Sequence, residues 1–207
     1  PNIPESVIAF LAVASLGAIW SVCSPDMGRV AVLDRFRQIA PKAMIAVDGY
    51  RYGGKAHDRR ALVGELLGEL PSVEHLVLLP QLDPAAGTAG FANATTWADA
   101  TAGNAPLMPE HVPFDHPLWV VYSSGTTGLP KPIVHSQGGV IIEHLKAITF
   151  HLDLGPGDRY HWYSTTGWMM WNFQVGGLLA GCTICLFDGN PGTPDLNALW
   201  RFVADQR

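Results

Sequence analysis

Hydrophobic and polar residues follow two different periodicities in the first eighty positions of the chain. Apolar side chains recur three and four positions apart, which is the spacing of one helix face, in residues 4–16, 30–39 and 56–70. Apolar runs of strand length lie between and after them, in residues 18–23, 43–47 and 75–79. Helices that alternate with buried strands at these lengths are typical of βαβ units. The pattern predicts an α/β fold with largely parallel sheets and flanking helices.

This alternation is interrupted at residues 81–115, which are rich in Ala, Gly, Thr and Pro and show little periodicity. Such a composition is typical of a long irregular connection, in which we expect at most a short strand or helix near Trp97. Beyond it the alternation returns, with strands expected at residues 118–122, 160–163 and 182–187 and helices at residues 138–150 and 196–203. We expect residues 1–207 to belong to one domain that contains this connection.

The composition limits the classes of protein that fit. Hydrophobic residues make up 48% of the 207 positions and charged residues 15%, which fits a globular protein with a large core. A net charge of −5 without a block of lysines and arginines gives no support for nucleic-acid binding. Three cysteines, an odd number, argue against a disulfide scaffold and fit a reducing compartment such as the cytoplasm. Because the chain starts without an initiator methionine and ends within a helical pattern, we expect a fragment of a longer protein.

Residues 6–25 carry no charge, and their number is close to that of a membrane-spanning helix. Gly17 in the middle and Pro25 at the end, together with several small polar residues, fit a helix followed by a buried strand equally well. We expect this second arrangement and no contact with a membrane, and a membrane anchor remains the alternative.

The sequence Tyr-Ser-Ser-Gly-Thr-Thr-Gly-Leu-Pro-Lys at residues 122–131 joins an expected strand to an expected helix. Glycines let backbone N–H groups approach an anion closely, hydroxyls add donors and lysine adds a positive charge, so the expected ligand is a phosphate chain. The Walker motif places lysine directly after glycine, whereas Lys131 stands three residues after Gly128, so that motif is excluded. The G-x-G-x-x-G dinucleotide fingerprint is absent as well. A flexible loop without a ligand is the alternative that the residues leave open.

Residues 123–131 resemble the phosphate-binding signature of the adenylate-forming enzymes, which include acyl-CoA synthetases, luciferases and peptide synthetases. Further strings are similar to the acetoacetate-activating branch of the acyl-CoA synthetases, at residues 16–26, 32–39, 134–136 and 166–172. Among them, Gly-Trp-Met-Met-Trp-Asn at residues 167–172 is the most specific. The resemblance covers nearly the whole chain apart from residues 81–115. It implies part of the large N-terminal domain of an adenylate-forming enzyme, with the C-terminal domain absent from the sequence.

The resemblance implies a two-step reaction of acetoacetate with ATP and coenzyme A, assisted by Mg²⁺. The carboxylate attacks the α-phosphorus of ATP, pyrophosphate leaves, and the thiol of coenzyme A then displaces AMP from the acyl-adenylate. Because a carboxylate must approach a polyanion, the site needs preorganised donors and positive charge. The resemblance assigns Thr126 and Lys131 as catalytic residues. It assigns the triphosphate to Ser123, Ser124, Gly125, Thr126, Thr127, Gly128 and Lys131.

The resemblance also places Trp168 in the wall of the pocket for the carboxylic acid, with Met169 and Met170 beside it. By residue type, tryptophan and methionine are more typical of core packing, and this alternative stays open for the two methionines. The 3′-phosphate of coenzyme A needs cations, for which Arg51 and Lys55 are the candidates. Solvated loop charges explain these two side chains equally well.

No metal ligands are expected from the residues. Cys182 and Cys185 lie three apart in an expected strand, so their side chains point to opposite faces and do not form a metal or redox pair. His144 and His151 share a helix face but lack a third ligand nearby in the sequence. Two other functions stay open, a ligase for another short acid such as acetate or propionate and a non-catalytic nucleotide-binding module. We expect the fragment by itself to be inactive, because the family's later acidic residues and C-terminal lysine are not in this sequence.

Overall fold

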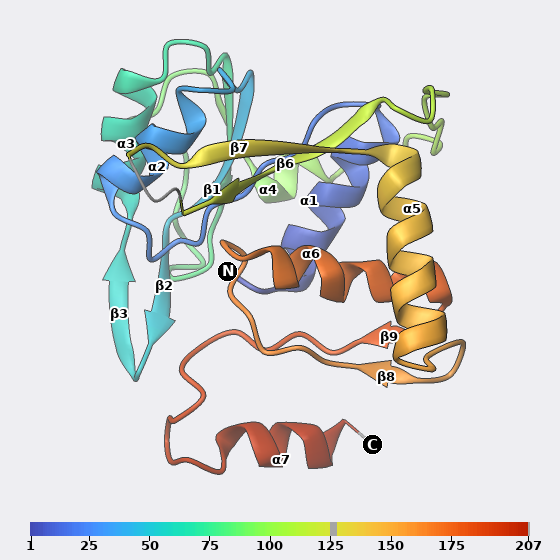
Figure 1. Ribbon diagram of the computed structural model, residues 1–207. Coiled ribbons are helices and arrows are strands. Elements are labelled where there is room, and N and C mark those ends of the chain that lie inside the picture. The colour runs from blue at the N-terminus through green and yellow to red at the C-terminus, as the bar shows by residue number, and fades with distance from the viewer. Residues whose placement is uncertain (125–127, 207) are drawn as a thin grey trace. The chain divides into compact units, whose positions relative to one another are not determined.

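The computed structural model describes residues 1–124 and 128–206. The chain divides into two units (Figure 1). The first unit comprises Pro1–Ser24, Leu107–Ser123 and Pro132–Arg207, and the second comprises Pro25–Pro106 and Ser124–Lys131. Each unit has its own strands, helices and buried apolar residues.

The second unit is built on a parallel sheet with the strand order β1-β4-β5, formed by Ala43–Val47, His75–Leu79 and Ala94–Thr96. β1 and β4 pair along their whole lengths, with Ala43 opposite His75. Helix α3, Arg60–Glu69, lies between them in the chain and makes the crossover that parallel neighbours require (Figure 1). The prediction of an α/β fold with parallel pairing is therefore confirmed, and so are the bounds of β1 and β4.

A β-hairpin that the sequence pattern did not predict follows β1. Its strands are β2, Gly49–Tyr52, and β3, Lys55–Asp58, which pair antiparallel. Gly53 and Gly54 join them with φ angles of 56° and 78°, the left-handed backbone that a two-residue hairpin turn needs. The helix expected at residues 56–70 therefore begins only after β3, and its predicted start is wrong.

The connection that follows β4 is fixed by the buried carboxylate of Asp48, at the end of β1. Its oxygens accept hydrogen bonds from the backbone N–H groups of Gln81, Leu82 and Asp83 at 2.7–2.8 Å. Three charge-assisted bonds to a buried carboxylate hold the start of this connection against the end of β1. Further along the same stretch, β5 leads directly into the short helix α4, Trp97–Ala100.

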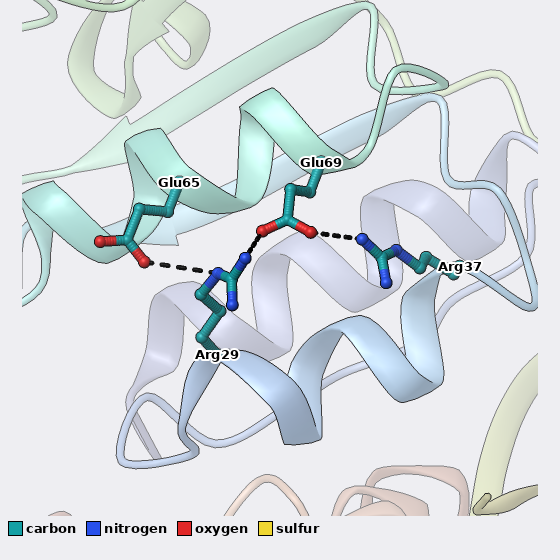
Figure 2. A network of polar contacts seen from close by, with 4 residues as sticks. All are labelled: Arg29, Arg37, Glu65 and Glu69. Carbon is teal, nitrogen blue, oxygen red and sulfur yellow. Dashed lines mark hydrogen bonds and ion pairs between the residues drawn. The ribbon is translucent and has the colours of Figure 1, made fainter.

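Helix α2, Arg29–Phe36, packs beside α3 in the second unit. Figure 2 shows the ion pairs that join them: Arg29 contacts Glu65 at 3.5 Å and also contacts Glu69, which in turn contacts Arg37. All four side chains are partly exposed, so water screens the pairs and each contributes at most about 1 kcal/mol. More of the stabilisation comes from the buried apolar residues of the two helices, which are Val32, Leu33, Val63 and Leu66.

The first unit packs helices against short strands (Figure 1). Its elements in chain order are α1 Pro4–Ser15, β6 Pro117–Ser123, β7 Lys131–Ser136, α5 Gln137–Leu145, a π-helix Lys146–His151, β8 Arg159–Tyr160, α6 Met169–Val175, a 3₁₀-helix Gly176–Ala180, β9 Thr183–Ile184 and α7 Ala198–Asp205. β7 was not predicted, because its apolar run is short and follows proline. It is hydrogen-bonded to β6, and the linker of residues 124–130 is too short for a parallel crossover, so the two strands run antiparallel.

The uncharged stretch of residues 6–25 contains most of α1 but not the strand expected at residues 18–23. In place of that strand, a single parallel bridge pairs Trp20 with Trp119 of β6. The strand prediction is therefore wrong beyond this one pairing. None of the helices in residues 1–124 and 128–206 combines the length and the apolar character needed to cross a membrane.

β8 and β9 are parallel but shorter than the strands expected at residues 160–163 and 182–187. Side chains take over the hydrogen bonding where the ladder ends. The carbonyl oxygen of Cys185 accepts a hydrogen bond from Nδ1 of His161 and another from Nε2 of Gln174, both at 2.8 Å. Because these donors replace backbone N–H groups, the strand pairing stops there.

Aromatic rings fill the core of the first unit. Trp171 of α6 is 0% exposed, and its ring centroid lies 6.2 Å from that of Phe10 and 6.5 Å from that of Trp20. Trp119 of β6 is also buried, with its ring 5.5 Å from Phe10. The aliphatic members of this core are Val7, Leu118, Val140 and Val175. Helices α1, α5 and α6 and strand β6 thus share one core.

Candidate functional site

The glycine- and hydroxyl-rich loop of residues 122–131 lies between β6 and β7. Three of its expected phosphate ligands fall outside the described residues, namely Gly125, Thr126 and Thr127. Ser123 ends β6 and is half-buried, and Lys131 begins β7. Ser124, Gly128 and Lys131 are exposed. The described hydroxyl and amine groups that the sequence selected are therefore accessible to a ligand from solvent.

Gly128 has a backbone conformation that explains why glycine stands at this position. Its φ of 141° lies in a region that residues with a Cβ rarely adopt. Among the described residues beyond its chain neighbours, nothing lies within 4 Å of the place that a Cβ would take. The requirement therefore comes from the backbone and not from crowding. Open backbone of this kind can approach an anion closely.

A partly buried hydrogen bond joins the two strands that flank the loop in the chain. The indole Nε1–H of Trp119 in β6 donates to Nδ1 of His135 in β7 at 2.9 Å. Because Nδ1 accepts this bond, it carries no proton, and a neutral His135 is protonated on Nε2. Trp119 stands four residues before Ser123, and His135 stands four residues after Lys131. The bond therefore joins β6 to β7 four residues before Ser123 and four residues after Lys131.

A second contact holds the end of the loop within the second unit. Nε2 of Gln38, which follows α2, donates to the carbonyl oxygen of Pro130 at 2.9 Å and to that of Asp34 at 2.6 Å. Gln38 and Pro130 are 92 residues apart, so no local pattern could have identified this pair. The motif ending in Pro130 and Lys131 is thus tethered through its backbone while the lysine side chain stays exposed.

The string of residues 167–172, which the resemblance assigns to an acid pocket, divides into an exposed half and a buried half. Trp168 is 69% exposed and Met169 is 52% exposed, whereas Trp171 and Asn172 are buried. Met170 is intermediate. Core packing within the described residues therefore does not account for Trp168 and Met169.

The buried half of this string is held by a residue that sequence reasoning did not select. Trp171 Nε1 donates a hydrogen bond to Oδ1 of Asn2 at 3.0 Å, across 169 positions of the chain. Both side chains are buried. A tryptophan in a buried site usually needs such a partner for its N–H group, but nothing local in the sequence indicates which residue supplies it.

The structure does not bring Arg51 and Lys55 together on one face of the β2–β3 hairpin. Arg51 pairs with Ala56, and the next residue, Tyr52, pairs with Lys55. Paired residues of an antiparallel ladder share a face and successive residues alternate, so the two cations lie on opposite faces. Both side chains are exposed.

The two histidines of the α5 region have different environments. His144 is buried beside the rings of Trp119 and Phe173, at 5.6 and 5.5 Å between centroids, whereas His151 is exposed. Burial lowers the pKa of His144, and this outweighs the opposing effect of the Glu143 carboxylate. In the part of the chain that the structure describes, no three His, Cys, Asp or Glu side chains are grouped so that they could hold a metal ion.

The two cysteines near β9 are free thiols with buried side chains. Cys182 Sγ donates to the carbonyl oxygen of Gly155 at 3.5 Å. Burial raises the pKa of the Cys182 thiol, because the thiolate would lose its hydration, and the nearby Asp158 carboxylate acts in the same direction. This environment favours the unreactive thiol form of Cys182.

The chain thus combines a parallel α/β sheet with a glycine- and hydroxyl-rich segment that lies between two strands and carries no Walker motif. The sequence profile of the family described as "AMP-binding enzyme" matches residues 1–207. The chain belongs to this family.

The names of individual relatives are more specific than the description of the family. The chain is 48% identical over 210 residues to acetoacetyl-coenzyme A synthetase of Rhizobium meliloti, with 100% of this chain and 32% of that protein covered. It is 41% identical to acetoacetyl-CoA synthetase of Mus musculus, with 98% and 31% covered. A solved structure of acetoacetyl-CoA synthetase from Streptomyces lividans matches with a TM-score of 0.93 and 56% identity, over 98% of this chain and 31% of that one. The chain therefore spans 31–32% of the length of these relatives.

Proposed function

We propose that the complete protein is an ATP-dependent, AMP-forming acid–CoA ligase that converts acetoacetate to acetoacetyl-CoA. The main support for this proposal is the similarity to the Streptomyces lividans acetoacetyl-CoA synthetase, at 56% identity and a TM-score of 0.93 over 98% of this chain. Residues 1–207 would be part of the N-terminal adenylation domain, with residues 81–115 as a connection within it. On this proposal the isolated fragment lacks groups that adenylation needs and is inactive.

The loop of residues 122–131 would hold the triphosphate of ATP. Lys131 would offset charge as pyrophosphate leaves, and backbone N–H groups around Gly128 would contact phosphate oxygens. The exposure of Lys131 and the left-handed φ of Gly128 support this role. The other assigned phosphate ligands are Ser123, Ser124, Gly125, Thr126 and Thr127, with Thr126 and Lys131 as the catalytic pair.

Mg²⁺ would accompany the nucleotide and would neutralise part of the phosphate charge when bound. No group of three or more acidic, histidine or cysteine side chains among the described residues is placed to hold it. We therefore assign no ligand among the described residues and no step to the ion.

Trp168, Met169 and Met170 would line the pocket for the acid. Trp168 and Met169 are exposed in this part of the protein, which leaves their side chains available to contact an acid. Acetoacetate is small and carries a methyl ketone, so an apolar wall can contact the methyl end while the carboxylate stays free to react. Arg51 or Lys55 would contact the 3′-phosphate of coenzyme A, and their opposite faces make simultaneous binding of one phosphate by both unfavourable.

The partners in this proposal are small molecules, namely ATP, acetoacetate and coenzyme A, and the proposed location is the cytoplasm. Cys182 and Cys185 are free thiols, which fits a reducing compartment.

Thioester formation by the complete gene product tests the proposal. Acetoacetate, acetate and propionate would be supplied in turn with ATP, Mg²⁺ and coenzyme A, and AMP and acyl-CoA would be quantified. We expect kcat/KM to be highest for acetoacetate. Equal or better use of acetate or propionate would favour the alternative ligase, and ATP binding without any thioester would favour a nucleotide-binding module.

A further inference from the structure

Asn2 is buried and uses both ends of its amide in contacts with distant parts of the first unit. It is 4% exposed. Its Oδ1 accepts the indole N–H of Trp171 at 3.0 Å, and its Nδ2 donates to the carbonyl oxygen of Phe187 at 3.2 Å. Its backbone N–H donates to Oδ1 of Asp188 at 2.8 Å. Asn2 thus joins α6 to the segment that follows β9.

The packed ring of Trp171 holds α6 in the core of the first unit. Its ring is fully buried against Phe10 and Trp20, which restricts where the ring can lie. Ring packing does not by itself decide which edge of the indole points where. The bond to Asn2 does, because a flipped indole would leave a buried donor and a buried acceptor unpaired.

The positions of the exposed residues at the start of α6 depend on the position of Trp171. Trp168 is the N-cap residue of the helix, and no side-chain hydrogen bond caps it there. The backbone N–H of Trp171 donates to the carbonyl oxygen of Trp168 at 3.0 Å, so the two residues are joined directly. Trp168 itself is 69% exposed and gains little positional restraint from packing. Its placement is therefore set by two backbone hydrogen bonds, the one from Trp171 and one in which its own N–H donates to the carbonyl oxygen of Thr165 at 3.2 Å.

We infer that Asn2 is a positioning residue for the acid pocket, acting through its hydrogen bond to Trp171 to set Trp168 and Met169. The inference rests on the proposed function. Asn2 touches none of the three substrates in this account. It limits the orientations of α6, so that the apolar wall is in place before the acid binds.

A double-mutant cycle in the complete gene product tests the inference. Asn2→Ala removes the acceptor, and Trp171→Phe removes the donor while keeping an aromatic ring. Each single variant should raise KM for acetoacetate about 5- to 10-fold, the effect of one buried hydrogen bond, with KM for ATP changed less than about 2-fold. The double variant should be no worse than the more impaired single one, because the same bond is already lost.

Trp119→Phe is a matched control. Trp119 belongs to the same core, contacts the same Phe10 and also donates an indole hydrogen bond, which is partly buried and goes to His135. It should leave KM for acetoacetate unchanged. Thermal unfolding of all variants shows whether each one folds, and Trp171→Phe supplies the test if Asn2→Ala does not.

The outcomes separate this inference from the proposed function. Parallel increases of KM for ATP and acetoacetate, multiplicative effects of the two substitutions, or an equal effect of Trp119→Phe would each overturn the positioning role. An unchanged KM for acetoacetate in both single variants would overturn it too. A wild-type protein that forms no thioester from any acid overturns the proposed function, and the inference that rests on it.

Discussion

The loop of residues 122–131 and the string of residues 167–172 are held in opposite ways. The loop is held near its ends, by the Trp119–His135 bond between its flanking strands and by the contact of Gln38 with Pro130, and its described residues Ser124 and Gly128 are exposed. The string is fixed at its centre, where Trp171 is buried, and it exposes its first apolar residues. A phosphate-binding loop needs accessible backbone N–H groups. An apolar pocket needs exposed side chains whose positions are fixed by neighbouring residues in the core.

The largest predicted difference lies between two tryptophans three positions apart. Trp171→Ala should lower the free energy of unfolding by about 3–5 kcal/mol, because it empties a fully buried site and leaves Asn2 unpaired. Trp168→Ala should change it by less than about 1 kcal/mol, since that ring is mostly exposed. Urea denaturation of both variants measures the difference. Similar losses in the two would show that Trp168 also belongs to the core.

Gly128→Ala should have the next largest effect on stability. Alanine at a φ of 141° is strained, and we expect a loss of about 1–2 kcal/mol in the free energy of unfolding. Gly103→Ala is the control, because Gly103 has no positive φ and open space around its Cβ position. That variant should be neutral or slightly stabilising. Equal behaviour of the two alanines would mean that the loop backbone relaxes without strain.

Because His144 is buried, we predict that the stability of the first unit decreases at acidic pH. Burial lowers its pKa below the ordinary 6.5, so the unfolded chain binds a proton there more readily than the folded chain. The contribution to stability is therefore complete above about pH 6.5 and decreases as the pH falls through the window down to the folded pKa. Denaturation curves from about pH 8 to about pH 5 should show a steeper loss for the wild type than for His144→Gln.

His151→Gln is the control for this pH dependence, because His151 is exposed. It should follow the wild-type curve. A wild type and a His144→Gln variant with the same pH dependence would contradict the assignment of acid sensitivity to His144.

The smallest effect is expected at the α2–α3 ion pairs of the second unit (Figure 2). Glu69→Gln removes the carboxylate that contacts both Arg29 and Arg37, and it should reduce the free energy of unfolding by about 0.5–1 kcal/mol. The difference from wild type should nearly vanish in about 1 M salt, where charges are screened within a few ångströms. A larger loss that persists in salt would indicate that Glu69 acts through packing.

The fold class was predictable because it depends on local periodicity. The strands at residues 43–47 and 75–79 were located correctly from short apolar runs alone. The β2–β3 hairpin was missed although Gly53-Gly54 is a hairpin signal, because its strands are short and mostly polar. The strands in the last third were overestimated, since side chains of His161 and Gln174 occupy the carbonyl that would continue the ladder.

The sequence could select candidate site residues only where they are consecutive. The order of glycines, hydroxyls and lysine at residues 123–131 predicts a phosphate chain as ligand, and this stays a prediction. The contacts of Gln38 with Pro130 and of Asn2 with Trp171 span 92 and 169 positions. No pattern of neighbouring residues encodes such pairs, so they become visible only when the chain is folded.

One kinetic comparison tests the central claim that the loop serves the nucleotide and the string serves the acid. KM for ATP and KM for acetoacetate would be measured in the complete gene product with Gly128→Ala and with Trp168→Ala. We predict a crossed result, in which Gly128→Ala raises KM for ATP with little change for the acid and Trp168→Ala does the reverse. Both constants rising together in either variant, or a change in the opposite substrate, would contradict the division of roles.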